Sequence, residues 1–245
     1  MSSVVLAIAD LLVEVGRPLW VGVDGPDGAG KSHFARALAD ELVGRGHAVQ
    51  HASVDDFHHP RAHRHALGRT PETVWARSFD YRAICRELLD PWRRGSGTSY
   101  SPTWHDLDSD RHTIVPSTVP ERGILIVDGV FLQRPELIDR WDLTVYLDAP
   151  PEVTVARMAT RDGTPEDPEH PDQRRYLLAQ ERYRTSCDPL GSADVVVGNA
   201  DWQRPVIRPF PHGGAWRRQG DEIVRTVRLP ADATDRAAAI DRLVD

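Results

Sequence analysis

The sequence predicts an α/β fold of three layers, α/β/α, with helices on both faces of a mostly parallel, doubly wound sheet. Three observations support this prediction. Short apolar runs of strand length alternate with segments in which apolar residues recur at helical spacing. A glycine-rich loop separates the first such run from the helix after it. Acidic residues follow several of the runs, at the strand ends where sheets of this class bind ligands.

The strands and helices follow from two different spacings of apolar residues. Each expected strand is a short apolar run, and each expected helix has apolar residues three and four positions apart. Because strands alternate with helices, we expect right-handed crossovers between parallel strands. The expected strands are 19–23, 48–54, 123–128, 143–147 and 194–197, and the expected helices are 4–15, 34–43, 80–89, 151–160 and 173–185.

The remaining segments carry weaker signals. Residues 58–77 and 95–120 are expected to form loops, and the charged, proline-rich segment 161–172 is expected to be mobile. One domain is therefore expected over 1–200, followed by a C-terminal extension, 201–245, whose role the sequence does not indicate. Within the extension we expect a linker at 205–219, a strand at 222–229 and a helix at 233–244.

Composition restricts the class of protein. The net charge of −7 argues against a nucleic-acid partner. Two cysteines are too few for a disulfide framework, which suits a reducing cytoplasm. No run reaches 18 apolar residues and the N-terminal segment lacks a basic region, so we expect neither a membrane span nor a signal peptide.

The stretch Gly25–Ser32, GPDGAGKS, fits the P-loop pattern G-x-x-x-x-G-K-[ST] between a strand and a helix. In a P-loop, backbone N–H groups and the helix N-terminus bind phosphates. Lys31 is the only lysine among 30 basic residues, and its compact ammonium suits a narrow phosphate nest better than a planar guanidinium. The motif predicts a P-loop NTPase fold with ATP, or another nucleoside triphosphate, and Mg²⁺ as cofactors. The predicted nucleotide-binding residues of this stretch and the next position are Gly25, Asp27, Gly28, Ala29, Gly30, Lys31, Ser32 and His33.

Acidic residues at the ends of the predicted strands suggest phosphoryl transfer. A kinase needs one carboxylate to accept the proton of the attacked hydroxyl and another to help hold Mg²⁺. Asp55 and Asp128 are the candidates for these two tasks, and Ser32 is expected to share the metal. Asp148 is more typical of a helix or turn cap.

Further motifs resemble the uridine kinases, within the wider uridine kinase and phosphoribulokinase group of P-loop kinases. In order along residues 18–200, after the P-loop, they are SVDDFH (53–58), FDY (79–81), HDLDSDR (105–111), ILIVDGVFL (124–132) and YLLAQERYRTSCDPLGSADVVVGNAD (176–201). The P-loop alone is specific only to the superfamily, whereas the combination of motifs is much more specific.

The resemblance implies roles for individual residues. Asp55 matches the catalytic base toward a ribose 5′-hydroxyl, and Arg157 and Arg161 resemble arginines of a mobile lid, here about 157–175, that close on the phosphates. The implied catalytic residues are therefore Asp55, Lys31 and Arg161. The residues assigned to the acceptor are Asp55, His58, Asp80, Trp104, Asp106, Arg111, Gln180 and Tyr183.

The expected activity is ATP-dependent phosphorylation of a nucleoside, similar to uridine or cytidine, to the 5′-monophosphate. The chain departs from the family where it has His58 for tyrosine, Asp128 for glutamate and His105 for the tyrosine of a tyrosine–aspartate pair. These departures leave open another acceptor, such as pantothenate, a sugar phosphate or a specialised metabolite. A nucleotide-binding regulator is a further alternative, and the oligomeric state is open, a homo-oligomer included.

Several other residues carry two interpretations. A zinc site at His51, His58, His59, His63 and His65 is a minor alternative, because the spacings match no strong motif. Trp75, Trp92 and Trp104 are more typical of packing than of stacking on a base, with Trp104 the best stacking candidate. The pair Arg174–Arg175 is typical of a solvated helix face, with contact to phosphate near the lid as the alternative.

Overall fold

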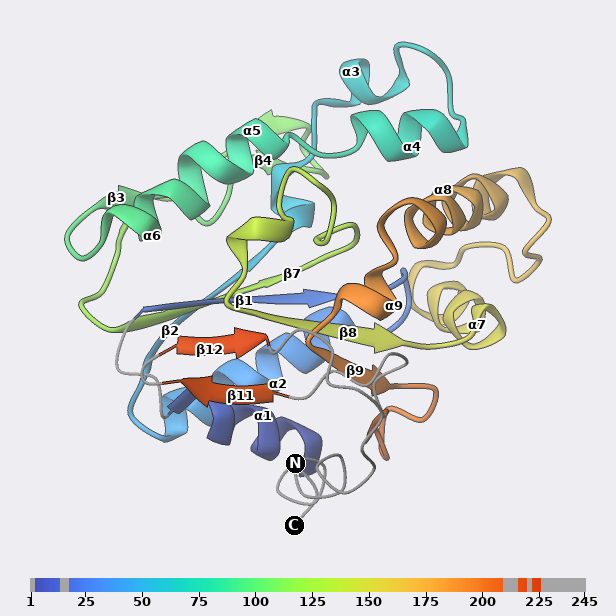
Figure 1. Ribbon diagram of the computed structural model, residues 1–245. Coiled ribbons are helices and arrows are strands. Elements are labelled where there is room, and N and C mark those ends of the chain that lie inside the picture. The colour runs from blue at the N-terminus through green and yellow to red at the C-terminus, as the bar shows by residue number, and fades with distance from the viewer. Residues whose placement is uncertain (1–2, 14–17, 209–215, 220–221, 226–245) are drawn as a thin grey trace.

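A six-stranded sheet forms the centre of the molecule in the computed structural model (Figure 1), which describes residues 3–13, 18–208, 216–219 and 222–225. Its strand order is β10-β9-β8-β1-β7-β2, and all neighbours are parallel except β10 and β9. The predicted mostly parallel sheet is confirmed. The strands are β1 (Leu19–Asp24), β2 (Ala48–Ser53), β7 (Gly123–Asp128), β8 (Leu143–Asp148), β9 (Val195–Gly198) and β10 (Val206–Ile207).

Helices α1 (Ser3–Val13) and α2 (Lys31–Gly44) cover one face of the sheet (Figure 1). Alternate side chains of a strand point to opposite faces, so Val21 and Val23 of β1 reach this face. They pack with Ile8 of α1 and Leu38 of α2, all of them fully buried. The apolar stripes read from the sequence therefore form one of the two cores.

The opposite face is covered by a longer, more aromatic set of helices. The chain from Asp80 is continuously helical through α5 (Tyr81–Ala83), a π-helical turn η2 (Ile84–Leu89) and α6 (Asp90–Arg94). The carboxylate of Asp80 accepts a hydrogen bond from the Ala83 N–H, as its predicted role of N-cap requires. Leu88 and Trp92 are completely buried in this second core. The helix continues past Pro91 rather than ending before it.

The prediction of loops at 58–77 and 95–120 was wrong in part. Two short helices, α3 (Arg61–His65) and α4 (Pro71–Arg77), lie in the first segment. Thr70 and Thr73 form a reciprocal capping box at the start of α4, which local polar chemistry rather than apolar periodicity stabilises. The second segment contains two strand pairs, β3 (Ser99–Tyr100) with β6 (Ser117–Thr118) and β4 (His105–Asp106) with β5 (Arg111–His112).

The predicted lid, 157–175, covers parts of two helices and the loop between them. Helix α7 (Pro151–Asp162) ends at Gly163, which has a left-handed φ of 66°, and α8 (Pro171–Cys187) begins after the loop 163–170. A short helix, α9 (Pro189–Ser192), then leads into β9. Two 3-10 turns, η1 (Val54–Phe57) and η3 (Ile138–Arg140), complete the main part of the chain.

The described part of the C-terminal extension begins by completing the sheet. Strand β10 pairs with β9, and β11 (Trp216–Gln219) pairs with β12 (Glu222–Arg225) as a separate hairpin. The predicted linker at 205–219 therefore contains strands, whereas the strand predicted to start at 222 does start there. The helix predicted at 233–244 lies outside the described residues.

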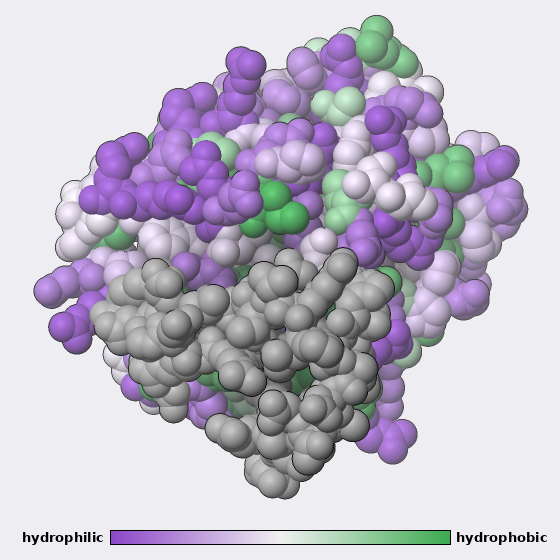
Figure 2. Space-filling view, viewed as in Figure 1, coloured by the Kyte–Doolittle hydropathy of each residue, from purple (hydrophilic) through white to green (hydrophobic). Residues whose placement is uncertain are grey.

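The surface of the described residues on the side shown in Figure 2 is mainly hydrophilic, with hydrophobic residues scattered singly. This distribution fits a chain whose apolar side chains fill two cores, one on each face of the sheet. Within the described ranges, none of the helices combines the length and apolar character needed to span a membrane.

Candidate active site

The P-loop, residues 25–32, connects the end of β1 to the start of α2. Gly28 and Gly30 adopt left-handed φ values of 76° and 92°, a conformation that residues with a Cβ rarely adopt. A Cβ at Gly28 would also lie 2.4 Å from the carbonyl oxygen of Thr154. Both glycines are therefore required by the path of the backbone, and the loop has the glycine-dependent conformation expected of a phosphate nest.

Lys31 lies inside the molecule rather than on its surface. The residue is only 9% exposed, and its ammonium donates a hydrogen bond of 2.8 Å to the carbonyl oxygen of Pro26. The side chain lines a cavity of about 480 Å³ that also includes Ser32, Asp55, Asp128 and the P-loop glycines. The loop thus holds a compact cation at the wall of a cleft rich in carboxylates.

Asp128 is held at the end of β7 by side chains from two other elements. The hydroxyl of Ser32 donates to one carboxylate oxygen at 2.6 Å, and Nε2 of His51 lies 2.7 Å from the other. Asp128 is 1% exposed, so these two partners replace the water that a free carboxylate would bind.

A hydroxyl and a carboxylate that touch and line the same cavity provide the oxygen ligands that Mg²⁺ prefers. The predicted pair Ser32 and Asp128 is therefore brought together, and its chemistry fits a magnesium ion carried with a nucleotide. Among the described residues, no group of three His, Cys, Asp or Glu side chains is arranged to hold a metal on its own.

Asp55 lies in the 3-10 turn η1 directly after β2. The hydroxyl of Ser53 accepts a hydrogen bond from the Asp55 N–H and caps the turn. The residue keeps exposed surface toward the cavity, although protein surrounds its carboxyl on the other sides. Loss of solvent around the carboxyl is the main cause that raises the pKa of Asp55 to about 6, and the carboxylates of Asp27 and Asp128 add to it against Lys31. A carboxylate with this pKa accepts protons more readily than an ordinary aspartate.

Two arginines of α7 face the same region. Arg157 donates to the backbone oxygens of Gly28, Asn199 and Ala200 at 3.4, 3.0 and 2.8 Å, which links the P-loop to the end of β9. Arg161 pairs with Asp162 at 2.6 Å and lines the cavity with Asp55. Both cations predicted for the phosphates therefore lie beside the P-loop.

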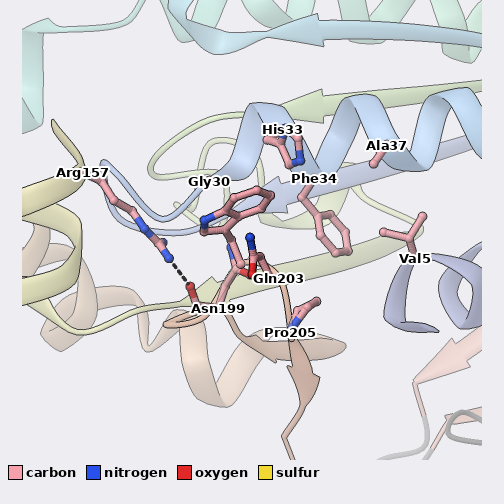
Figure 3. A pocket seen from close by; sticks show the side chains of 10 residues that line it. Val5, Gly30, His33, Phe34, Ala37, Arg157, Asn199, Gln203 and Pro205 are labelled. Carbon is pink, nitrogen blue, oxygen red and sulfur yellow. Dashed lines mark hydrogen bonds between the residues drawn. The ribbon is translucent and has the colours of Figure 1, made fainter. Parts of the chain in front are cut away.

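A second cavity of about 620 Å³ adjoins the first (Figure 3). The two cavities share Gly30, His33 and Arg157. The second is lined largely by apolar and aromatic groups, with the ring of Trp202 at 5.8 Å from that of His33 in an edge-to-face arrangement. The site therefore has two compartments, one charged and one mainly apolar, that meet at the start of α2.

The comparisons with known proteins agree with this geometry. No protein-family model matches the chain. A uridine kinase from Ligilactobacillus salivarius is 24% identical over 150 residues, 60% of this chain and 67% of that protein. A uridine kinase from Alkaliphilus metalliredigens is 27% identical over 153 residues, 60% of this chain and 70% of that protein.

Solved structures share the fold. A possible uridine kinase from Bacillus stearothermophilus superposes with a TM-score of 0.63 at 22% identity, over 79% of this chain and 96% of that chain. The YGR205w protein superposes with a TM-score of 0.56 at 13% identity, over 85% of this chain and 99% of that chain. The chain resembles uridine kinases in sequence and shares its fold with a possible uridine kinase. It is accordingly an ATP-dependent small-molecule kinase.

Among the residues predicted for the acceptor, His58 contacts the backbone of Asp55, and the backbone N–H of Asp80 donates to the backbone oxygen of Phe57. Nδ1 of His58 is 2.8 Å from the backbone oxygen of Asp55, so this nitrogen carries a hydrogen and donates it. Burial lowers the pKa of His58 to about 4, against that hydrogen bond, which raises it. One carboxylate oxygen of Asp80 accepts the helix-capping hydrogen bond from the Ala83 N–H, and the other lies 4.0 Å from Nδ1 of His59.

Residues assigned to the acceptor from β4 and β5 form a small unit of their own. The Trp104 ring packs edge-to-face on His112, and its centroid lies 4.9 Å from the Arg86 guanidinium. The backbone N–H of Trp104 donates to the backbone oxygen of Asp56. Asp106 accepts two hydrogen bonds from Ser109, and Arg111 is exposed opposite it on β5. Neither Asp106 nor Arg111 lines the cavities described above.

The two residues predicted on α8 have contacts within the kinase itself. Gln180 donates a hydrogen bond of 3.0 Å to Asp27 of the P-loop. Tyr183 is 3% exposed and its hydroxyl donates to Asp24, while it accepts from the Gln133 N–H at 2.9 Å. Tyr183 is thus placed in the core beneath the P-loop, because its ring belongs to the aromatic cluster of the second core.

Sequence reasoning missed several residues of the site. Asp24 is fully buried below the P-loop and accepts from Gly25, Tyr183 and Gln133. Asn199 donates to the Ala29 backbone oxygen at 2.7 Å. An acid or an amide directly after a buried strand was the available signal for both residues, but their partners come from distant parts of the chain.

Lys31→Arg should lower kcat by at least about 10-fold while nucleotide binding is retained. The guanidinium keeps the charge but exceeds the space that a 9% exposed ammonium occupies beside Pro26. Steady-state kinetics with ATP varied would measure the change. Arg36→Lys, at an exposed position of the same cavity, is the matched control, and full activity of Lys31→Arg would contradict the geometric argument.

Asp55→Asn should be more stable than the wild type near neutral pH and equally stable in acid. The folded pKa of about 6 lies above the ordinary value of 3.8, so the folded state binds this proton more tightly. The wild type therefore loses stability as the pH rises from 3.8 to about 6, whereas asparagine does not ionise. Melting temperatures across this range test the prediction, and a difference independent of pH would contradict it.

Proposed function

We propose that this kinase transfers the γ-phosphoryl group of ATP to a hydroxyl of a small molecule, with Asp55 as the catalytic base. The observation that carries the proposal is the shared cavity of Lys31, Ser32, Asp128 and Asp55. One cavity is thus lined by cations for the phosphates, by oxygen ligands for Mg²⁺ and by a carboxylate of raised pKa. These are the parts that phosphoryl transfer requires.

The division of tasks follows from the contacts of each residue. The P-loop amides and Lys31 would bind the β- and γ-phosphates, and Ser32 and Asp128 would hold Mg²⁺. Bound Mg²⁺ would neutralise charge on the phosphates as the bond to the leaving oxygen breaks. Arg157 and Arg161 would add positive charge from the side of the lid. Asp55 would accept the hydroxyl proton, because its pKa of about 6 keeps it ionised yet basic near neutral pH.

The mainly apolar cavity beside the P-loop would hold the nucleoside of ATP. It begins at Gly30 and His33, where the phosphate cavity ends, and offers the Trp202 ring as a surface for a base. Aromatic side chains in such positions stack on bases. Arg157 lies between the two compartments and would contact the phosphates and the nucleoside together.

A nucleoside similar to uridine or cytidine is one candidate acceptor, supported by the names of the relatives. A second candidate class, such as pantothenate or a sugar phosphate, is supported by two histidines among and beside the residues assigned to the acceptor. Neutral His58 and buried His105 occupy positions next to Asp55 and Trp104 where the family pattern has tyrosine.

Asp55→Asn should bind ATP normally and reduce turnover by at least about 100-fold, because a general base contributes about 10²- to 10⁴-fold. ATP consumption measured over nucleosides, pantothenate and sugar phosphates tests this, with mass spectrometry of the phosphorylated product. Asp56→Asn is the matched control, since Asp56 lies next to the base but is not among the cavity residues. Unchanged turnover in Asp55→Asn would remove Asp55 from the mechanism.

Trp202→Ala should raise the KM for ATP by about 5- to 20-fold with little change in kcat, because stacking contributes about 1–3 kcal/mol per base. Steady-state kinetics measure the effect, and quenching of tryptophan fluorescence by ATP gives an independent readout. Val206→Ala, exposed in the adjacent strand, is the control. An unchanged KM would place the base elsewhere.

A further inference from the structure

Four arginines gather where α3 and the loop before α4 approach the start of α8. They are Arg61, Arg64, Arg69 and Arg175. Burial and the charges of all four lower the pKa of His65, so all four cations lie within electrostatic range of this side chain. An ion pair of 2.9 Å between Arg69 and Asp172 joins the two sides. Figure 1 shows α3 and α4 on the side of the molecule that carries α8.

Arg64 connects this cluster to the catalytic base. Its Nε donates a hydrogen bond of 2.8 Å to the backbone oxygen of His59, and the adjacent His58 is hydrogen-bonded to the backbone of Asp55. Burial lowers the pKa of Arg64, Asp110 raises it, and Arg61 and Arg175 lower it again. Arg64 is therefore a partly buried cation, close to other cations, one short hydrogen-bonded path from Asp55.

Arg175 supplies the observation that points to a ligand. Its side chain is 10% exposed, yet its Nε is buried and has no hydrogen-bond partner. The carboxylate of Asp172 lies 4.0 Å away and already pairs with Arg69, while Nη2 of Arg175 donates to the Tyr176 hydroxyl at 2.9 Å. A buried charged donor without a partner is costly, and an anion that reached it would remove this cost.

The charge balance of the region favours an anion. Two carboxylates lie near the four arginines. Asp172 pairs with Arg69, and Asp110 accepts a hydrogen bond from the backbone N–H of Arg61 and lies 3.2 Å from Nε2 of His105. Glu169 pairs with Arg174 instead, at 3.6 Å, and Asp80 faces His59. Positive charge is thus in excess around α3 and the start of α8.

We infer that the acceptor of this kinase is an acid, whose carboxylate or phosphate group binds between Arg64 and Arg175 while its hydroxyl meets Asp55. The inference rests on the proposed function and specifies its substrate class. Guanidinium groups bind planar and tetrahedral oxyanions through paired N–H donors. A neutral nucleoside would leave the Nε of Arg175 without a partner, so the cluster selects against it.

The first test measures binding of inorganic phosphate to the full chain saturated with Mg²⁺ and a non-hydrolysable ATP analogue, so that the P-loop is occupied. Isothermal titration should detect binding that Arg64→Gln and Arg175→Gln each weaken by about 10-fold or more, since a charged hydrogen bond contributes about 1.5–3 kcal/mol. Arg174→Gln is the matched control, because Arg174 is adjacent but 59% exposed and paired with Glu169. Melting curves of all variants show whether they fold. No phosphate binding, or equal binding in all variants, would overturn the inference.

The second test compares acceptors that differ in their anionic group. Pantothenate is paired with neutral panthenol, and fructose 1-phosphate with fructose, while uridine and cytidine serve as neutral nucleosides. Any productive pair should favour the acid by at least about 10-fold in kcat/KM, and Arg175→Gln should remove this preference by raising KM for the acid rather than lowering kcat.

The outcomes separate the inference from the proposed function. Turnover of a nucleoside that equals or exceeds turnover of the acids would support a kinase and overturn the anionic acceptor. Phosphate binding that depends on Arg64 and Arg175, without phosphorylation of any acceptor, would support the anion site and count against the proposed function.

Discussion

The parallel register of β2, β7 and β1 is the constraint on which the site depends. Asp128 is the register partner of Val23 in β1 and of Ser53 in β2, so these three strands end at one level. The P-loop follows β1, and the turn that contains Asp55 follows β2. The P-loop, Asp128 and Asp55 are therefore adjacent because the backbone ladder places their strands side by side, before any side chain makes a contact.

Crowding of carboxylates at this edge determines the electrostatics of the kinase. Burial and neighbouring carboxylates raise the pKa values of both Asp55 and Asp56. Lys31 opposes this effect at Asp55, and the arginines of α7 line the same cavity. Because carboxylates repel a polyanion such as a triphosphate, a cleft rich in carboxylates needs a divalent metal ion and nearby cationic side chains to bind one. The cluster of arginines on α3 and α8 extends the same principle to the acceptor.

Contacts below the P-loop join it to the segment after the lid. Asp24 connects the end of β1 to Tyr183 of α8, and Gln180, one turn earlier, binds Asp27 in the loop itself. Arg157 of α7 binds Gly28 and the end of β9. Both helices that flank the loop 163–170 are thereby joined to the P-loop by hydrogen bonds.

Sequence alone determined the fold class, the P-loop and the strand ends that carry Asp55 and Asp128, because apolar periodicity and local motifs need only neighbouring residues. The short helices α3 and α4 were missed, since short polar helices show no apolar stripe. Tertiary structure decided what depends on distant partners: Tyr183 in the core on Asp24, His51 on Asp128, and Arg64 near Arg175. Those contacts join residues far apart in the chain, and only the packing of the helices on the sheet brings them within reach.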